Sequence, residues 1–288
     1  MQKRTDLALE AALAYGDTLP EDAQKQERQE GDVTITTLSL GEKAADAMGR
    51  AAGNYVTAQL PPLTDNEQEL EAAAIRIATE LRRLLPAAGT VLVVGLGNEA
   101  ITPDALGPAA ARMVLATRHI QGEFARSVGL DDLRPVAVLS PGVLGNTGME
   151  SGELTAGVCA RIRPAAVIAV DALAAGSLSR LGCTVQLSDT GIAPGSGVGN
   201  NRQALNQELL GAPVIGIGVP TVVDAVTIAE ELAHHDGGDI VSPRGAAMMV
   251  TPREIDLMIR RASRLVAMTI NAALQPAYSP LELIAVAV

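Results

Sequence analysis

The chain has 288 residues, a net charge of −11, 48% hydrophobic residues and only 1% aromatic residues. The apolar content is sufficient for a sizeable core, and the length favours one α/β domain over residues 1–288. Nucleic acids require a positive field and aromatic stacking surfaces, and this composition supplies neither. A nucleic-acid partner is therefore not expected.

A membrane partner is not expected either. No apolar run reaches the roughly 20 residues that a spanning helix needs, and the charged start contains no signal-peptide core. We therefore expect a cytoplasmic protein. Cys159 and Cys183 stand alone, without the spacing of a disulfide framework or a thiolate zinc site, and we interpret them as buried thiols.

The first third of the chain predicts few regular elements. Residues 1–31 are polar and rich in Gln and Glu, which predicts a surface arm. Residues 32–40 alternate apolar and polar positions, as in a half-buried strand. A capping-box sequence at 64–67 predicts the start of a helix that ends near Leu85.

Strands and helices alternate through the remainder. Apolar runs predict strands, and the stretches between them predict helices. The last helix is the clearest, since Thr251, Pro252 and Glu254 form an N-terminal capping sequence before an apolar stripe. The apolar tail at 281–288 predicts a terminal strand or a packed end. We predict a mainly parallel sheet flanked by helices, with strands at 90–94, 136–139, 165–170, 184–187 and 214–219 and helices at about 108–119, 150–162 and 222–233.

Two aspartates follow predicted buried strands, at the sheet edge where open α/β sheets bind ligands. These are Asp104 and Asp171. Two carboxyl groups that face each other cannot both ionise, so one can hold a proton while the other activates water. Both residues also have purely structural interpretations, because Asp104 can stabilise the first turn of a helix and Asp171 can cap one.

Other polar side chains and glycines follow the same strands. The sequence Asp189-Thr190-Gly191 matches the tripeptide of pepsin-like proteases, but those proteins are all-β, so we interpret the match as coincidental. Backbone N–H groups of Gly195–Gly199 are candidates for binding an oxyanion. Capping or loop-bonding roles remain open for several members of this group. The candidate supporting residues are Asn98, Thr102, Glu150, Asp189, Gly197, Asn200 and Asp224.

No cofactor or metal site is predicted. The turn at Gly95-Leu96-Gly97 resembles a dinucleotide fingerprint, but Ala100 replaces its third glycine, and no P-loop is present. The three histidines lie in neither a zinc-protease nor a serine-hydrolase motif.

Several longer stretches together carry a resemblance to the spore germination protease family of endospore-forming bacteria. They are RTDLA from Arg4, VGLGN from Val94, TPDALGP from Thr102, TRH from Thr117, SPGV from Ser140, AVDALAA from Ala169, SDTG from Ser188, PGSGVGN from Pro194, GIGVPTVVDAVT from Gly216 and VTPREID from Val250.

This resemblance implies an endopeptidase that degrades small acid-soluble spore proteins during germination, in the spore core. It implies an atypical aspartic peptidase whose catalytic residues correspond to Asp104 and Asp171. The fold would be a phosphorylase/hydrolase-like sandwich similar to that of hydrogenase maturation peptidases. Family members are tetrameric zymogens with a propeptide ahead of the RTDLA stretch, whereas three residues precede Arg4 here. They also carry an insertion where this chain has a short loop at 234–250.

Two other functions remain open. One is a metal-linked peptidase of the hydrogenase-maturation type. The other is an inactive homologue that serves as a binding or scaffold protein.

Overall fold

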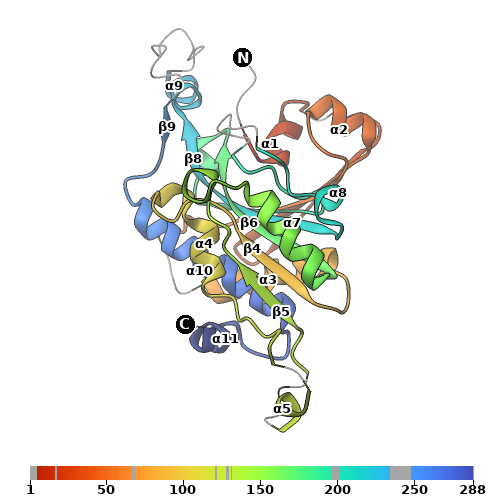
Figure 1. Ribbon diagram of the computed structural model, residues 1–288. Helices are drawn as coiled ribbons and strands as arrows, with labels where there is room; N and C mark the ends of the chain where they lie inside the picture. The colour runs from red at the N-terminus through yellow and green to blue at the C-terminus, as the bar shows by residue number, and fades with distance from the viewer. Residues whose placement is uncertain are drawn as a thin grey trace.

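The computed structural model describes residues 5–16, 18–65, 69–120, 122–127, 130, 132–195, 202–233 and 248–287 (Figure 1). Within these residues the chain forms an α/β structure, in which one mixed sheet is flanked by helices. Its strand order is β1-β2-β3-β7-β8-β6-β4-β5, and β9 pairs with β8 outside this path. None of the described helices is long and apolar enough to cross a membrane.

The sheet has a parallel half and an antiparallel half. Parallel pairing joins β4 (Val91–Gly95), β5 (Val136–Leu139), β6 (Ala166–Ala175) and β8 (Val214–Asp224). Antiparallel pairing joins β1 (Ala23–Glu30), β2 (Val33–Leu40), β3 (Gly53–Gln59) and β7 (Thr184–Ser188), attaches β7 to β8, and adds β9 (Met249–Val250) to the end of β8.

The prediction of a mainly parallel sheet is therefore wrong. β1 and β2 are joined by the tight turn at Gly31-Asp32, and a connection this short can only produce antiparallel strands. Gly31 adopts a positive φ of 65° in this turn, as tight hairpins require. The predicted strands at 32–40, 90–94, 136–139 and 184–187 are present, and those at 165–170 and 214–219 are longer than expected.

The first 31 residues also differ from the expected surface arm. Residues 8–13 form helix α1 (Ala8–Leu13), with Leu7 and Ala8 fully buried. β1 pairs with β2 along its whole length, although most of its side chains are exposed. The polar composition therefore reflects an edge strand that faces solvent, and its order comes from backbone pairing with β2.

Helices cover both faces of the sheet (Figure 1). One face packs against α3 (Leu70–Leu84), α4 (Leu106–Ala111) and α10 (Ile255–Leu274) through a large aliphatic core. The opposite face packs against α7 (Ser151–Ile162) and α8 (Gln207–Leu210). The remaining helices are α2 (Glu42–Met48), α5 (Gly122–Ser127), α6 (Leu144–Thr147), α9 (Ala225–Ala233), α11 (Pro280–Ala287), η1 (Thr102–Asp104) and η2 (Leu178–Arg180).

Several predicted helix boundaries are wrong. The helix expected from residue 64 begins at Leu70, without a side-chain cap, and Glu67 of the expected capping box lies outside the described residues. The helix expected at 108–119 spans Leu106–Ala111, and the one expected from 222 begins at Ala225 because β8 continues to Asp224. The tail forms a helix, α11, and the strand alternative is wrong.

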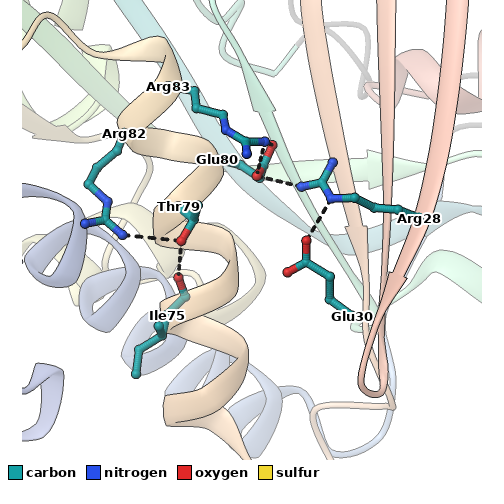
Figure 2. Close-up of polar contacts among 7 residues, drawn as sticks. All are labelled: Arg28, Glu30, Ile75, Thr79, Glu80, Arg82 and Arg83. Carbon is teal, nitrogen blue, oxygen red and sulfur yellow. Dashed lines mark hydrogen bonds and ion pairs between the residues drawn. The ribbon is translucent and has the colours of Figure 1, made fainter.

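A buried carboxylate attaches the antiparallel edge to α3 (Figure 2). Glu80 of α3 is 4% exposed, and its Oε1 lies 2.6 Å from a guanidinium nitrogen of Arg28 on β1. Arg83 donates to the same carboxylate, while the Arg28 Nε donates to Glu30 at 2.7 Å. The network therefore connects the outermost strand to a helix of the main core.

Substituting Glu80 with Ala is expected to lower the free energy of unfolding by about 1–3 kcal/mol, because Arg83 would lose the buried carboxylate and Arg28 would keep only Glu30. Arg28 and Arg83 are partly exposed, which keeps the loss below that of a fully buried pair. Urea unfolding measures the change. Glu30→Ala is the matched control, expected to cost less than about 0.5 kcal/mol; equal losses for both variants would contradict the role of burial.

Candidate active site

A cavity of about 270 Å³ lies beyond the end of β4 and beside the C-terminal half of β6. Asp104 and Asp171 both line it, together with segments from the loops after β4, β5 and β7. The mouth is partly apolar, with Ile101, Val143 and Met249 among its lining residues. The two aspartates that sequence reasoning paired therefore share one cavity.

Asp171 lies inside β6 rather than after it. The strand continues to Ala175, so the alternative that Asp171 caps a following helix is wrong. Its side chain is 3% exposed, and its carboxyl accepts the N–H of Ala172 at 3.0 Å. Burial raises the pKa of Asp171 well above its ordinary value, and the nearby negative charges of Asp104 and Asp6 raise it further.

The neighbouring strand β8 packs closely against the backbone of Asp171. Asp171 is in register with Gly218 of β8. A Cβ on Gly218 would lie 2.6 Å from both the backbone carbonyl oxygen of Asp171 and the Leu173 side chain, so a larger residue would push β8 away from β6. The close approach of the two strands therefore explains why a glycine, Gly218, interrupts the apolar run VIGIGV.

Asp104 is the last residue of the short helix η1, and only Ala105 separates it from α4. Its Oδ2 accepts the backbone N–H of Asn98 at 2.7 Å. The hydroxyl of Thr221, on β8, donates to the Pro103 carbonyl at 2.8 Å and ties η1 to the sheet. Burial raises the pKa of Asp104, while the Asn98 N–H and the positive charge of Arg202 oppose this rise.

Close backbone packing places η1 over the strand ends. The Leu96 N–H donates to the Val170 carbonyl at 2.8 Å, which joins the end of β4 to β6. Gly107 lies against these backbone atoms, where a Cβ would approach the Val170 carbonyl oxygen to 2.5 Å. Gly107 thus allows the start of α4 to approach the sheet closely enough to hold Asp104 beside the cavity.

The other candidates among the described residues fall outside the cavity lining. The Asn98 side chain accepts the Ala100 N–H at 3.0 Å, although its backbone N–H binds Asp104. The Thr102 carbonyl accepts the Ala105 N–H within η1. Glu150 precedes α7 without a side-chain capping bond. Asn98 therefore supports the acid through its backbone, and neither Thr102 nor Glu150 lines the cavity.

The remaining two described candidates have structural hydrogen bonds. Asp189 accepts the backbone and side-chain N–H groups of Asn54 at 2.7 Å, which reinforces the junction of β3 and β7. Asp224 caps α9 by accepting the Thr227 N–H at 2.9 Å and its hydroxyl at 2.7 Å. Gly197 and Asn200, with most of the predicted oxyanion segment, lie outside the described residues.

A model of the family described as "Germination protease" matches residues 15–235 of this chain. The chain belongs to the germination protease family. Similar proteins named germination protease occur in Caldanaerobacter subterraneus subsp. tengcongensis, at 40% identity over 97% of this chain and 96% of the relative, and in Clostridium perfringens, at 38% identity over 95% of each. A third, from Bacillus cytotoxicus, is 37% identical over 94% of this chain and 93% of the relative. Family membership implies a peptidase with a protein substrate.

Sequence reasoning missed two charged residues of this germination protease site. Asp6 lines the cavity, pairs through its N–H with the Ala174 carbonyl at 2.9 Å, and accepts the Ala174 N–H at 2.8 Å. Arg202 lines the cavity as well. Both are far from Asp104 and Asp171 in sequence, and neither follows an apolar strand. The only available signal was their position inside or beside stretches that resemble the family.

A second cavity, of about 320 Å³, adjoins the first, and both are lined by Asp6 and Leu173. Gly216 and Gly218 of β8 contribute to its lining, along with polar groups of Arg50, Gln186 and Ser188. Because residues 6 and 173 belong to both linings, the two cavities together can form a binding surface longer than a pocket for one side chain.

Metal binding finds no support in the described part of the chain, where no group of three or more His, Cys, Asp or Glu side chains is arranged to hold an ion. His234 and His235 lie outside the described residues.

Proposed function

We propose that this chain is an endopeptidase that hydrolyses small acid-soluble spore proteins during germination, with Asp104 and Asp171 as its catalytic acid pair. The observation that carries the proposal is that these two carboxyl groups line one cavity and that the charge of Asp104 raises the pKa of Asp171. An effect of one carboxylate on the pKa of the other is what an acid pair needs in order to share a single proton.

The environments of the two acids suggest different roles. Asp171 is more deeply buried, and this burial together with its neighbouring negative charges raises its pKa, which favours the protonated form. Asp104 accepts a backbone N–H bond and feels the positive charge of Arg202, both of which favour its carboxylate form. Asp104 is thus the general base and Asp171 the general acid in the free enzyme.

Hydrolysis then follows in two proton transfers. The Asp104 carboxylate takes a proton from water as the water oxygen attacks the scissile carbonyl carbon. Asp171 gives its proton to the amide nitrogen, and the C–N bond breaks to release a carboxylic acid and an amine. The proton on Asp104 returns to Asp171 through water or exchanges with solvent, which restores the starting state.

The two adjoining cavities support cleavage within a chain rather than at its end. A polypeptide that extends from the first cavity into the second would pass residues 6 and 173, next to the acid pair. Small acid-soluble spore proteins are proposed as substrates on the basis of the family resemblance. The same resemblance supports a homotetramer, synthesis as a zymogen, action in the spore core and a fold like that of hydrogenase maturation peptidases.

The function is tested by incubating the protein with a purified small acid-soluble spore protein and identifying the fragments by mass spectrometry. We expect a few internal cleavages that persist in excess chelator and disappear in the Asp104→Asn variant. Chelator-sensitive cleavage would favour the metal-linked alternative. Absence of cleavage with any spore protein or unfolded polypeptide would favour the inactive binding homologue.

A further inference from the structure

Arg202 is the cationic side chain of the acidic cavity. Among the described residues that line it, the charged groups are Asp6, Asp104, Asp171 and Arg202. Arg202 lines the same cavity as Asp104 and Asp171, and its positive charge opposes the rise that burial causes in the pKa of both acids.

The Arg202 guanidinium nevertheless has no hydrogen-bond or ion-pair partner among the described residues. Within the described part of the chain, Arg202 makes no hydrogen bond and lies beyond 4 Å from every carboxylate, whereas other partly buried arginines are bound to backbone carbonyls. Arg134 binds Pro86 and Arg261 binds Thr64, for example. An arginine that lines a cavity with two carboxyl groups, and that makes no bond to the described residues, has its N–H donors available for a ligand bound there.

We propose that Arg202 is a catalytic residue whose guanidinium donates hydrogen bonds to the scissile carbonyl oxygen and stabilises the oxyanion that forms on it. This inference rests on the proposed function. Attack of water converts the carbonyl oxygen into an anion, in a cavity that already holds at least one carboxylate. A fixed cation offsets that repulsion, and such donors act most strongly where water is excluded. The charge appears during the reaction, so the interaction lowers the barrier more than it strengthens substrate binding.

The kinetic test compares Arg202→Met, Arg202→Lys and Arg161→Met. Arg161 is an exposed residue of α7 outside the cavity, and its variant controls for loss of a positive charge. We expect Arg202→Met to lower kcat about 10²–10³-fold, the usual cost of losing one oxyanion donor, and to change KM by less than about threefold. Arg202→Lys should recover part of kcat, and Arg161→Met should match the wild type.

The pH profile provides a second readout that a structural role would not change. Removing the cation raises the pKa of both acids, so the acidic limb of kcat/KM moves to higher pH in Arg202→Met and less so in Arg202→Lys. An unchanged kcat with a raised KM would overturn the proposal, because Arg202 would then hold a distant group of the substrate. Equal kinetics for Arg202→Met and Arg161→Met would also overturn it.

Binding without turnover separates this inference from the catalytic proposal. A peptide with a phosphinate in place of the scissile amide presents a tetrahedral anion, and its affinity is measured by calorimetry. We expect Arg202→Met to weaken phosphinate binding at least tenfold and to change the affinity for the amide peptide by less than about threefold. Equal weakening of both ligands, or no weakening, would overturn the role of Arg202. Activity retained by Asp104→Asn would refute the catalytic role of the acid pair, and the phosphinate comparison would still decide the role of Arg202.

Discussion

An Asp171→Asn variant is expected to lose peptidase activity by about 10³–10⁴-fold and yet to unfold at a higher temperature than the wild type. The amide has nearly the shape of the carboxyl, but it can neither hold nor transfer the proton that the leaving amine requires. The loss of rate follows from the chemistry of the group, and the gain in stability follows from its burial.

The stability change has a definite sign and pH range. Asp171 has a raised pKa in the folded protein, so the folded state favours its neutral form. Below the unfolded pKa of about 4 both states are protonated, and the acid carries no penalty. As pH rises from there through the folded pKa, the unfolded chain ionises more readily and the fold loses stability. Asn cannot ionise, so its advantage should be present at pH 7 and should fade below about pH 4.

Calorimetric melting at pH 7 and at pH 3.5 measures this effect. We expect a stabilisation on the order of 1 kcal/mol at pH 7, which is about 2–4 °C in Tm for a chain of this size. Asp189→Asn is the matched control, because Asp189 binds Asn54 outside the cavity and should retain near wild-type activity. Retained activity in Asp171→Asn, or a stability gain that persists unchanged at low pH, would contradict the interpretation.

The sequence predicts best where a segment carries its own pattern. The period-two alternation of β2 and the apolar stripe of α10 both led to correct elements, since burial on one face leaves a local signature. β1 has no such signature, because most of its side chains face solvent and its order depends on β2. β3 was missed as well, although β2 and β7 of the antiparallel half were predicted as strands.

The residues of the candidate site differ in the same way, since some have a local signal in the sequence and others have none. Asp104 and Asp171 were found because each accompanies a buried strand, although β6 continues past Asp171 with a shift of register at Leu173/Ala174. Asp6 reaches the cavity by pairing with Ala174, and Arg202 lies beside a glycine-rich stretch, so neither position is signalled by nearby sequence. Contacts between segments this far apart come from the assembled sheet.

A Gly97→Ala variant should lose both stability and activity, because Gly97 controls the position of Asp104. Gly97 has a φ of 115°, a conformation that residues with a side chain rarely adopt. A Cβ there would collide with the Asp104 carbonyl oxygen and lie 3.1 Å from Oδ1 of the same residue. Both strain and overlap act on the segment that holds the proposed base.

We expect Gly97→Ala to cost about 2–4 kcal/mol of unfolding free energy, from the disfavoured backbone and the overlap together. Movement of Asp104 by a fraction of an ångström to 1 Å should lower kcat by about 10²-fold. Urea unfolding and peptide hydrolysis by the folded fraction measure the two effects separately.

Gly211→Ala isolates the backbone strain from the overlap. Gly211 has a φ of 68° after α8, and a Cβ there meets no atom within 4 Å. It should cost about 1–2 kcal/mol, with kcat unchanged. If Gly97→Ala unfolds like Gly211→Ala and keeps full activity, the segment from Gly97 to Asp104 tolerates displacement, and Asp104 cannot be a base whose placement limits the rate. A selective fall in kcat would instead connect the close approach of two backbone segments to the chemistry of the acid pair.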